Sequence, residues 1–218
     1  AKYHYAYVAP TTVGWDAIID LGKQINLQSF QALSDMKNGI AKPSSNSIIR
    51  LFKLCQDFID QDGVSYGDVT TWGRDKALVL DSLSGLNELA RQNTVGMKPT
   101  MAMGEWGVAM NLEEMFINKL TADMKAYFVV LAHIDRNVNE VTGGMVITPA
   151  ALGNKLGPKL GRFFSEVVMT IKKGDKFNWS TVEHNADVKQ RTLPLSSELT
   201  PSFVQLVESF NRRVEMTR

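Results

Sequence analysis

The stretch that most constrains this chain is residues 77–85, Ala-Leu-Val-Leu-Asp-Ser-Leu-Ser-Gly. Four consecutive apolar residues predict a strand buried on both faces, which ends at Asp81. Apolar spacing then predicts a helix over 83–92. In open α/β sheets, ligands bind beyond the carboxyl ends of the strands, where an acid can hold Mg²⁺ beside the phosphates of a nucleotide. Asp81 is therefore a candidate binding residue; the alternative is that it only caps the following helix.

A second stretch repeats this pattern. Residues 127–132, Tyr-Phe-Val-Val-Leu-Ala, predict another strand buried on both faces, and His133 follows it. The alternative for His133 is a core histidine whose ring nitrogens are satisfied by the backbone. A third apolar strand is predicted over 167–171. Strands that alternate with helices predict an α/β fold, with a mainly parallel sheet covered by helices on both faces.

The C-terminal part changes character. Lys172-Lys173-Gly174-Asp175 predicts a turn that leads into residues 177–182, so the region 172–195 is expected to hold an antiparallel hairpin. A single domain over 1–218 accounts for the whole chain.

The N-terminal part predicts a strand over 3–8, a helix that includes residues 15–25, and an amphipathic helix over 48–59. Two segments, 93–108 and 135–145, show no clean period. Long aperiodic segments inside a domain are usually functional or mobile loops, and both are expected to be such loops.

Composition excludes several classes of protein. The single cysteine, Cys55, excludes a disulfide framework or a cysteine metal site. The net charge of +1 argues neither for nor against a polyanion as a partner. No run of eighteen apolar residues occurs, so nothing in the sequence places the chain in a membrane, and a cytoplasmic location is expected.

Several motifs then follow in a definite order, and this order resembles the phage-encoded RecA-like ATPases, the AAA-domain group related to single-strand-annealing recombinases. The resemblance covers about residues 77–207. The motifs that carry it are Leu-Val-Leu-Asp-Ser at 78–82, Val-Val-Leu-Ala-His-Ile-Asp at 129–135, residues 151–160, residues 163–168, and Val-Lys-Gln-Arg-Thr-Leu-Pro-Leu at 188–195.

The resemblance implies a RecA-like sheet and an ATPase that uses ATP and Mg²⁺. Asp81 would be the acid beside the metal, and Ser82 its neighbour on the same shell of magnesium-bound water. His133 would sense the γ-phosphate at the end of the adjacent strand. Lys189 and Arg191 would reach toward a nucleotide held by a neighbouring subunit of a homo-oligomer.

The resemblance also implies single-stranded DNA as a partner, in phage recombination or replication in the host bacterial cytoplasm. The two aperiodic segments would present nucleic-acid contacts. Apart from the resemblance, basic charge is concentrated in a segment that is expected to follow a phosphate backbone and that includes Lys155, Lys159, Arg162, Lys172, Lys173 and Lys176. The alternatives are that Trp106 packs against its own domain or a partner subunit, and that the lysines form a solvated face. The candidate nucleic-acid residues are Lys98, Trp106, Arg136, Lys155 and Lys159.

One departure from the family matters. A P-loop needs Gly, four residues, Gly, Lys, then Ser or Thr, and no stretch of the chain has this spacing. In the family this loop precedes everything seen here, so either residues before Ala1 carry it or this relative has lost it. Three functions stay open: a DNA-dependent ATPase, a non-catalytic structural or DNA-binding scaffold, and a replicative helicase core.

Overall fold

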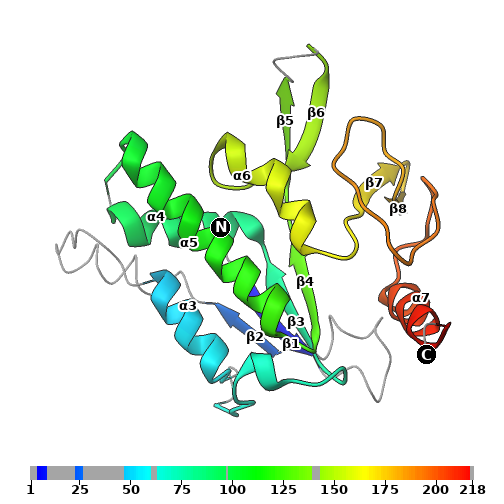
Figure 1. Cartoon of the computed structure of the whole chain (residues 1–218), viewed down its shortest axis with the longest axis horizontal. Helices are drawn as coiled ribbons and strands as arrows, with labels where there is room; N and C mark the ends of the chain where they lie inside the picture. The colour runs from blue at the N-terminus through cyan, green and yellow to red at the C-terminus, as the bar shows by residue number, and fades with distance from the viewer. Residues whose placement is uncertain are drawn as a thin grey trace.

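The structure is a computed structural model that describes residues 4–8, 23–26, 47–59, 63–96, 98–138 and 143–216. Figure 1 shows the arrangement of its elements. The strands are β1 (His4–Val8), β2 (Lys23–Asn26), β3 (Ala77–Asp81), β4 (Tyr127–Leu131), β5 (Ile134–Val138), β6 (Met145–Pro149), β7 (Met169–Lys173) and β8 (Lys176–Ser180). The helices are α3 (Ser47–Gln56), α4 (Leu83–Val95), α5 (Met103–Asp123), α6 (Gly153–Leu160) and α7 (Phe203–Met216), with 3-10 turns η2 (Val69–Thr71) and η3 (Gly161–Phe163).

The main sheet is small and mixed. Its strand order is β2-β1-β3-β4, and β1 runs antiparallel to both β2 and β3. Within this sheet β3 and β4 run parallel, in a register that pairs Ala77 with Tyr127 and Asp81 with Leu131. The prediction of a RecA-like, mainly parallel sheet flanked by helices on both faces is therefore wrong.

The later strands pair locally and do not extend this sheet. β5 pairs with β6, and β7 with β8, as two separate antiparallel hairpins. A hairpin satisfies its backbone hydrogen bonds within a few residues, whereas a parallel strand needs a long crossover connection. The apolar segment predicted as a third sheet strand thus supplies most of β7, which turns at Gly174 and Asp175 into β8.

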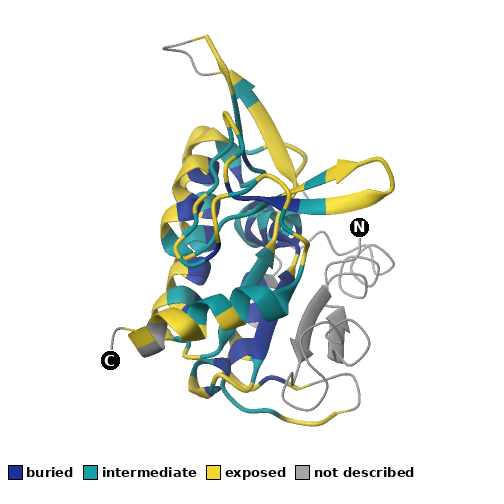
Figure 2. Ribbon diagram, turned by 90° about the vertical axis from the view of Figure 1, so that its right-hand side faces the viewer, coloured by how far each residue is buried: buried dark blue, intermediate teal, exposed yellow. Residues whose placement is uncertain are grey.

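Three helices and the inner strands bury the core. The helices α3, α4 and α5 pack together over β3, and the ribbon of their buried residues is coloured dark blue in Figure 2. Phe52 and Phe116 meet edge to face, with ring centroids 5.2 Å apart. The amphipathic pattern after Asn46 does form α3, whose Ile48, Leu51 and Cys55 are buried.

Two predictions of long loops are wrong. Most of segment 93–108 is helical, because α4 continues to Val95 and α5 begins at Met103. The Glu105 carboxylate accepts a hydrogen bond of 2.6 Å from the Ala102 backbone N–H, which caps the start of α5. Segment 135–145 contributes strands to the β5–β6 hairpin.

The expected helix over 15–25 is also wrong at its end, where residues 23–26 form β2. The rest of that helix lies outside the described residues. No helix in the described part of the chain is long and apolar enough to span a lipid bilayer.

Candidate functional site

The carboxyl ends of β3 and β4 lie at the same edge of the sheet, because these strands are parallel and in register. Ser84, in the first turn of α4, follows β3, and His133 follows β4. The Ser84 Oγ lies 3.0 Å from the His133 Nδ1, so a hydrogen bond joins the two strand ends. We call Asp81, Ser82, Ser84 and His133 the strand-exit edge.

The acid and the hydroxyls of this edge differ in exposure. Asp81 is exposed, whereas Ser82 is 8% exposed and stands at the N-cap of α4. The Ser82 side chain makes no capping hydrogen bond; its backbone oxygen accepts from the Gly85 N–H at 2.9 Å. Among the described residues, no hydrogen bond caps α4 through the Asp81 side chain either. The capping role considered for Asp81 therefore has no support in the contacts.

The backbone next to His133 is tied to neighbouring elements. The Ala150 N–H donates to the His133 carbonyl at 2.8 Å, and the Asn87 side chain on α4 donates to the Ala150 carbonyl at 2.9 Å. The base of the β5–β6 hairpin is thus attached to the strand-exit edge through Ala150.

Glu113 on α5 is fully buried and contacts the chain two residues after Ala150. Its Oε2 accepts a hydrogen bond of 3.3 Å from the Leu152 N–H, and its Oε1 has no partner among the described residues. Burial raises the pKa of the Glu113 carboxyl to about 8, against the smaller lowering effect of the Leu152 hydrogen bond. Sequence reasoning missed Glu113, although its spacing from the apolar Phe116, Ile117 and Leu120 places an acid on the buried face of the helix.

A cavity of about 900 Å³ extends along β4 and reaches the strand-exit edge. Its walls are mostly apolar and come from β4, the end of α5, residues 160–170 and α7. At the edge it is lined by Leu131, Ala132 and His133. Cavities of this size hold small organic ligands, and apolar walls with a few polar groups at one end are typical of such sites.

The side chains of the strand-exit edge determine which kind of metal ion could bind there. No group of three or more His, Cys, Asp or Glu side chains that could hold a metal ion occurs among the residues that the structure describes. Mg²⁺, however, keeps several waters and commonly takes only one or two carboxylates together with the phosphate oxygens of its substrate. The exposed Asp81 carboxylate fits this mode of binding, in which Mg²⁺ arrives with a nucleotide.

The two basic residues expected to act on a neighbouring subunit are held differently. The Lys189 Nζ donates to the Phe164 carbonyl at 2.7 Å, after the end of η3, so it is engaged within its own chain. The Arg191 N–H donates to the Glu166 carboxylate at 3.0 Å, and Arg191 itself is exposed. The described hydrogen bonds connect neither residue to the strand-exit edge.

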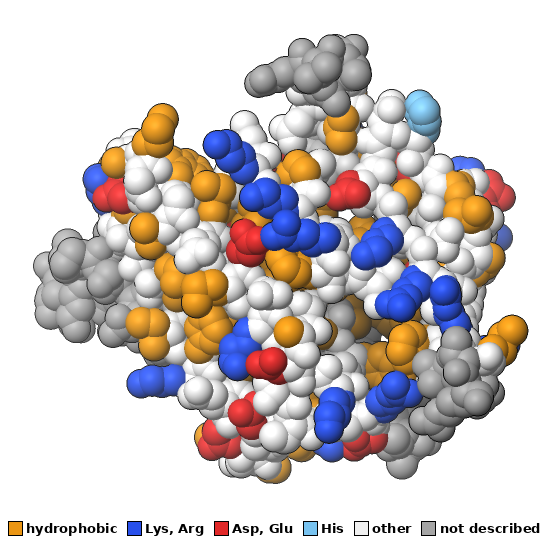
Figure 3. Space-filling view, viewed as in Figure 1, with side chains coloured by type: hydrophobic (Ala, Val, Ile, Leu, Met, Phe, Trp, Pro, Cys, Tyr) orange, Lys and Arg blue, Asp and Glu red, His pale blue; other side chains and the backbone are white. Residues whose placement is uncertain are grey.

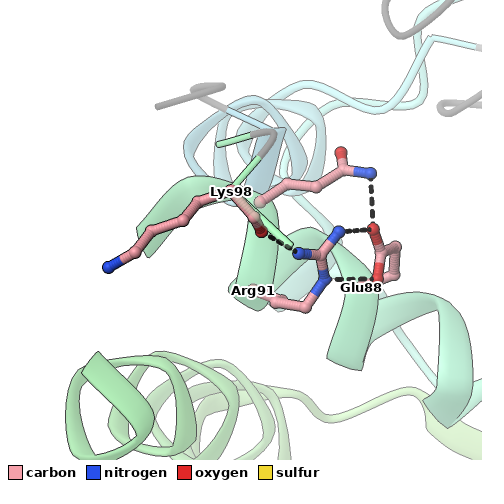
Figure 4. Close-up of polar contacts among 4 residues, drawn as sticks. Glu88, Arg91 and Lys98 are labelled. Atoms are coloured by element: carbon pink, nitrogen blue, oxygen red, sulfur yellow. Dashed lines mark hydrogen bonds and ion pairs between the residues drawn. The ribbon is translucent and has the colours of Figure 1, made fainter. Parts of the chain in front are cut away.

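The five candidate nucleic-acid residues come from different elements. Lys98 pairs with Glu105 at 3.0 Å. The Lys98 carbonyl accepts a hydrogen bond from Arg91, which also pairs with Glu88 at 2.6 Å (Figure 4). Trp106 lies on α5, and a Cβ added at Gly153 would stand 3.7 Å from its ring.

The expectation that Lys98, Trp106 and Arg136 belong to long loops is therefore wrong in part. Trp106 is helical and lies beside the start of α6, and Arg136 is exposed on strand β5. Only Lys98 lies between helices. Lys155 and Lys159 are exposed one turn apart on α6.

No family model matches this chain. Neither a curated protein nor a solved structure matches it. The case for a function therefore depends on the residues and their geometry.

Proposed function

We propose that the strand-exit edge binds the phosphates of a Mg²⁺-bound nucleotide, and that the protein is an ATP-binding and ATP-hydrolysing protein that acts on single-stranded DNA in phage recombination or replication. The observation that carries this proposal is the Ser84–His133 hydrogen bond, which joins the ends of two parallel strands beside Asp81. A carboxylate, a hydroxyl and an imidazole then share one edge, next to the start of a 13-residue helix whose first N–H groups favour anions.

Each residue has a proposed role. Asp81 would hold the metal, directly or through water, and Mg²⁺ would supply positive charge beside the phosphates. His133 would contact the terminal phosphate. Ser84, in place of Ser82, would lie on the shell of magnesium-bound water, because Ser82 is buried whereas Ser84 contacts His133.

The cavity along β4 supports the same proposal. It begins at His133 and is lined mainly by apolar side chains, which suits the base and sugar of a nucleotide whose phosphates lie at the polar edge. The sequence contains no P-loop stretch, so within residues 1–218 the phosphate-binding groups proposed are those of the edge.

The direct test compares two aspartates. We expect Asp81→Asn to abolish Mg²⁺-dependent binding of a fluorescent ATP analogue, and with it any ATP turnover stimulated by single-stranded DNA, in the full natural chain. The matched control is Asp75→Asn, which removes an exposed carboxylate just before β3, at the opposite end of that strand from Asp81. ATP binding and turnover by Asp81→Asn equal to those of the control would refute the nucleotide site.

Homo-oligomerisation belongs to the same proposal. Because Lys189 is engaged within its own chain, Arg191 is the better candidate for reaching a nucleotide on a neighbouring subunit. We expect Arg191→Ala to lower ATP turnover while ATP binding stays intact. Mixing the Arg191→Ala and Asp81→Asn proteins should then restore part of the ATP turnover. In a mixed oligomer, some boundaries combine Asp81 from one subunit with Arg191 from its neighbour.

A second candidate is a non-catalytic DNA-binding scaffold. The lack of a P-loop stretch in residues 1–218 favours it. Single-stranded DNA binding that ignores ATP, Mg²⁺ and the Asp81→Asn substitution would support this candidate over the ATPase.

A further inference from the structure

The outer end of the β7–β8 hairpin carries an exposed aromatic ring among lysines. Phe177 is 57% exposed, although large aromatic side chains are usually buried. Figure 2 shows the hairpin lengthwise, with its outer end drawn as exposed and extending beyond the helices. Lys172, Lys173 and Lys176 share this end and are all exposed.

The register of the hairpin determines which of these side chains lie on the same face. Lys172 lies directly across from Phe177, so both are on the same face, and the Lys172 Nζ is 5.8 Å from the centre of the Phe177 ring. Lys173 lies across from Lys176 on the other face. Glu198 pairs with Lys173 at 2.6 Å, whereas Lys172 and Lys176 have no ion pair among the described residues.

The base of the hairpin is held firmly, in contrast to its outer end. Trp179 is two residues from Phe177 on the same face, but it is 9% exposed and packs edge to face on Phe203 of α7 at 5.6 Å. Backbone hydrogen bonds in both directions also join Trp179 to Leu199, at 2.7 and 2.9 Å. The fold thus buries one aromatic ring of this face and leaves the other in solvent on a fixed support.

Charge is distributed unevenly along the chain around this hairpin. Residues 1–150 contain 13 Lys and Arg against 16 Asp and Glu, whereas residues 151–218 contain 11 against 7. Figure 3 shows Lys and Arg side chains gathered over α6 and toward β7, β8 and α7. A nearly neutral protein therefore has a positive C-terminal third, which favours a polyanion as a partner on this side.

We propose that the outer end of the β7–β8 hairpin contacts single-stranded nucleic acid, with Phe177 stacking on a base and Lys172 and Lys176 facing phosphates. This inference rests on the proposed function and adds to it the surface and the mode of contact. Exposed aromatic rings beside cationic side chains are the means by which single strands are bound without sequence preference, since every base has a face on which to stack. Bases inside a duplex are already stacked and do not offer those faces.

The test measures binding of a fluorescent 20-nucleotide oligo(dT) by anisotropy. Alanine substitution of a stacking aromatic ring is expected to weaken affinity at least about five-fold, so Phe177→Ala should do so and Phe177→Tyr should not. Leu195→Ala is the control, because Leu195 is 67% exposed and lies outside the hairpin. Lys172→Gln and Lys176→Gln should each lower the slope of log affinity against log salt by about 0.7. Binding of a duplex of the same length should not respond to Phe177→Ala.

Affinity of Phe177→Ala within two-fold of the native protein would overturn the inference, as would an equal loss in Leu195→Ala. Absence of oligonucleotide binding by the native protein would overturn it as well. The nucleotide site is judged separately, because Phe177 is not part of the strand-exit edge and Phe177→Ala should bind Mg²⁺-ATP as the native protein does. Circular dichroism checks that the variant is folded, which is expected for an exposed position.

Discussion

At the scale of single residues, Glu113 is an acidic side chain in an apolar interior. It is fully buried, one oxygen has no partner among the described residues, and the pKa of its carboxyl is raised to about 8. Near neutral pH the folded protein thus holds Glu113 mainly as the neutral acid, because an ionised carboxylate would lose its hydration without gaining an opposite charge.

This burial makes stability depend on pH. Below about pH 4.5 Glu113 is protonated in both the folded and the unfolded chain; between about 4.5 and 8 only the folded chain keeps the proton, so the free energy of unfolding falls as pH rises. Glu113→Gln stays neutral. Its stability relative to the native protein should rise by on the order of 5 kcal/mol between pH 4 and pH 9, at about 1.4 kcal/mol per pKa unit. Urea unfolding of both proteins at pH 4, 6 and 9 measures this, and a difference that is constant with pH would contradict it.

Cys55 is a second buried titratable residue. It is 8% exposed, and burial, with a smaller contribution from the charge of Asp68, raises the pKa of its thiol to about 12. Since the thiolate is the reactive form, alkylation of the folded protein by iodoacetamide at pH 8 should be at least about a hundred-fold slower than alkylation in urea. Mass spectrometry against time gives both rates, and equal rates would show that Cys55 is accessible.

At the scale of elements, the contact between α6 and β6 is unusually close. A Cβ added at Gly157 would stand 2.7 Å from the Pro149 carbonyl oxygen and 3.2 Å from the Thr148 Oγ1, so only glycine lets the helix approach the strand this closely. Since α6 follows the segment that Glu113 and Asn87 hold, this contact helps to fix the hairpin base beside His133.

The same substitution at two helical glycines should have opposite effects. Gly157→Ala must push α6 away from β6 and is expected to lower stability by about 1–3 kcal/mol. Gly107→Ala on α5 meets nothing within 4 Å and should raise stability by about 0.5–1 kcal/mol, because alanine is the better helix former. Thermal unfolding of both variants measures the two shifts, and a stabilised Gly157→Ala would refute the close packing.

At the scale of the whole molecule, apolar burial is concentrated in one region. The side chains buried most completely come mainly from α3, β3, α4 and α5, whereas most residues of β5 and of the outer part of β7–β8 are exposed. Helix α7 contacts this region through Phe203, Val204 and Val207, which pack near Ala77 and Tyr127.

Local unfolding should occur most readily in the elements that bury the fewest apolar side chains. Backbone amides of β3, α4 and the buried side of α5 are expected to exchange with deuterium last, near the rate of global unfolding, and those of β5–β6 first. Hydrogen exchange followed by mass spectrometry gives the order. Protection of the β5–β6 hairpin equal to that of α4 would mean that the hairpin is part of the core.

Much of the local structure follows from sequence, because four apolar residues in a row before Asp81 leave few alternatives to a buried strand. The pairing of the strands does not follow. Nothing in the composition of residues 4–8 tells whether that strand runs parallel or antiparallel to β3, and this orientation decides the type of sheet. The sequence of region 93–108 predicts a loop because Gly104, Gly107 and several methionines hide the helical period, whereas the cap from Glu105 determines where α5 begins.

The candidate site shows the same limit. Asp81 and His133 could be selected because each follows an apolar strand, and strand ends carry ligands in such sheets. Ser84, Asn87 and Glu113 could not be selected in this way, since their contacts join segments 39 to 63 residues apart. Lys189 matched a motif, but its hydrogen bonds to the Phe164 and Gly161 carbonyls depend on how the chain turns after β8.

The contact between Ser84 and His133 has one more property. A serine hydroxyl can either donate a hydrogen to an imidazole nitrogen or accept one from it. The Ser84–His133 contact is therefore compatible with either tautomer of the ring. Because Ser84 engages Nδ1, Nε2 is the ring nitrogen that is left for a ligand at this edge.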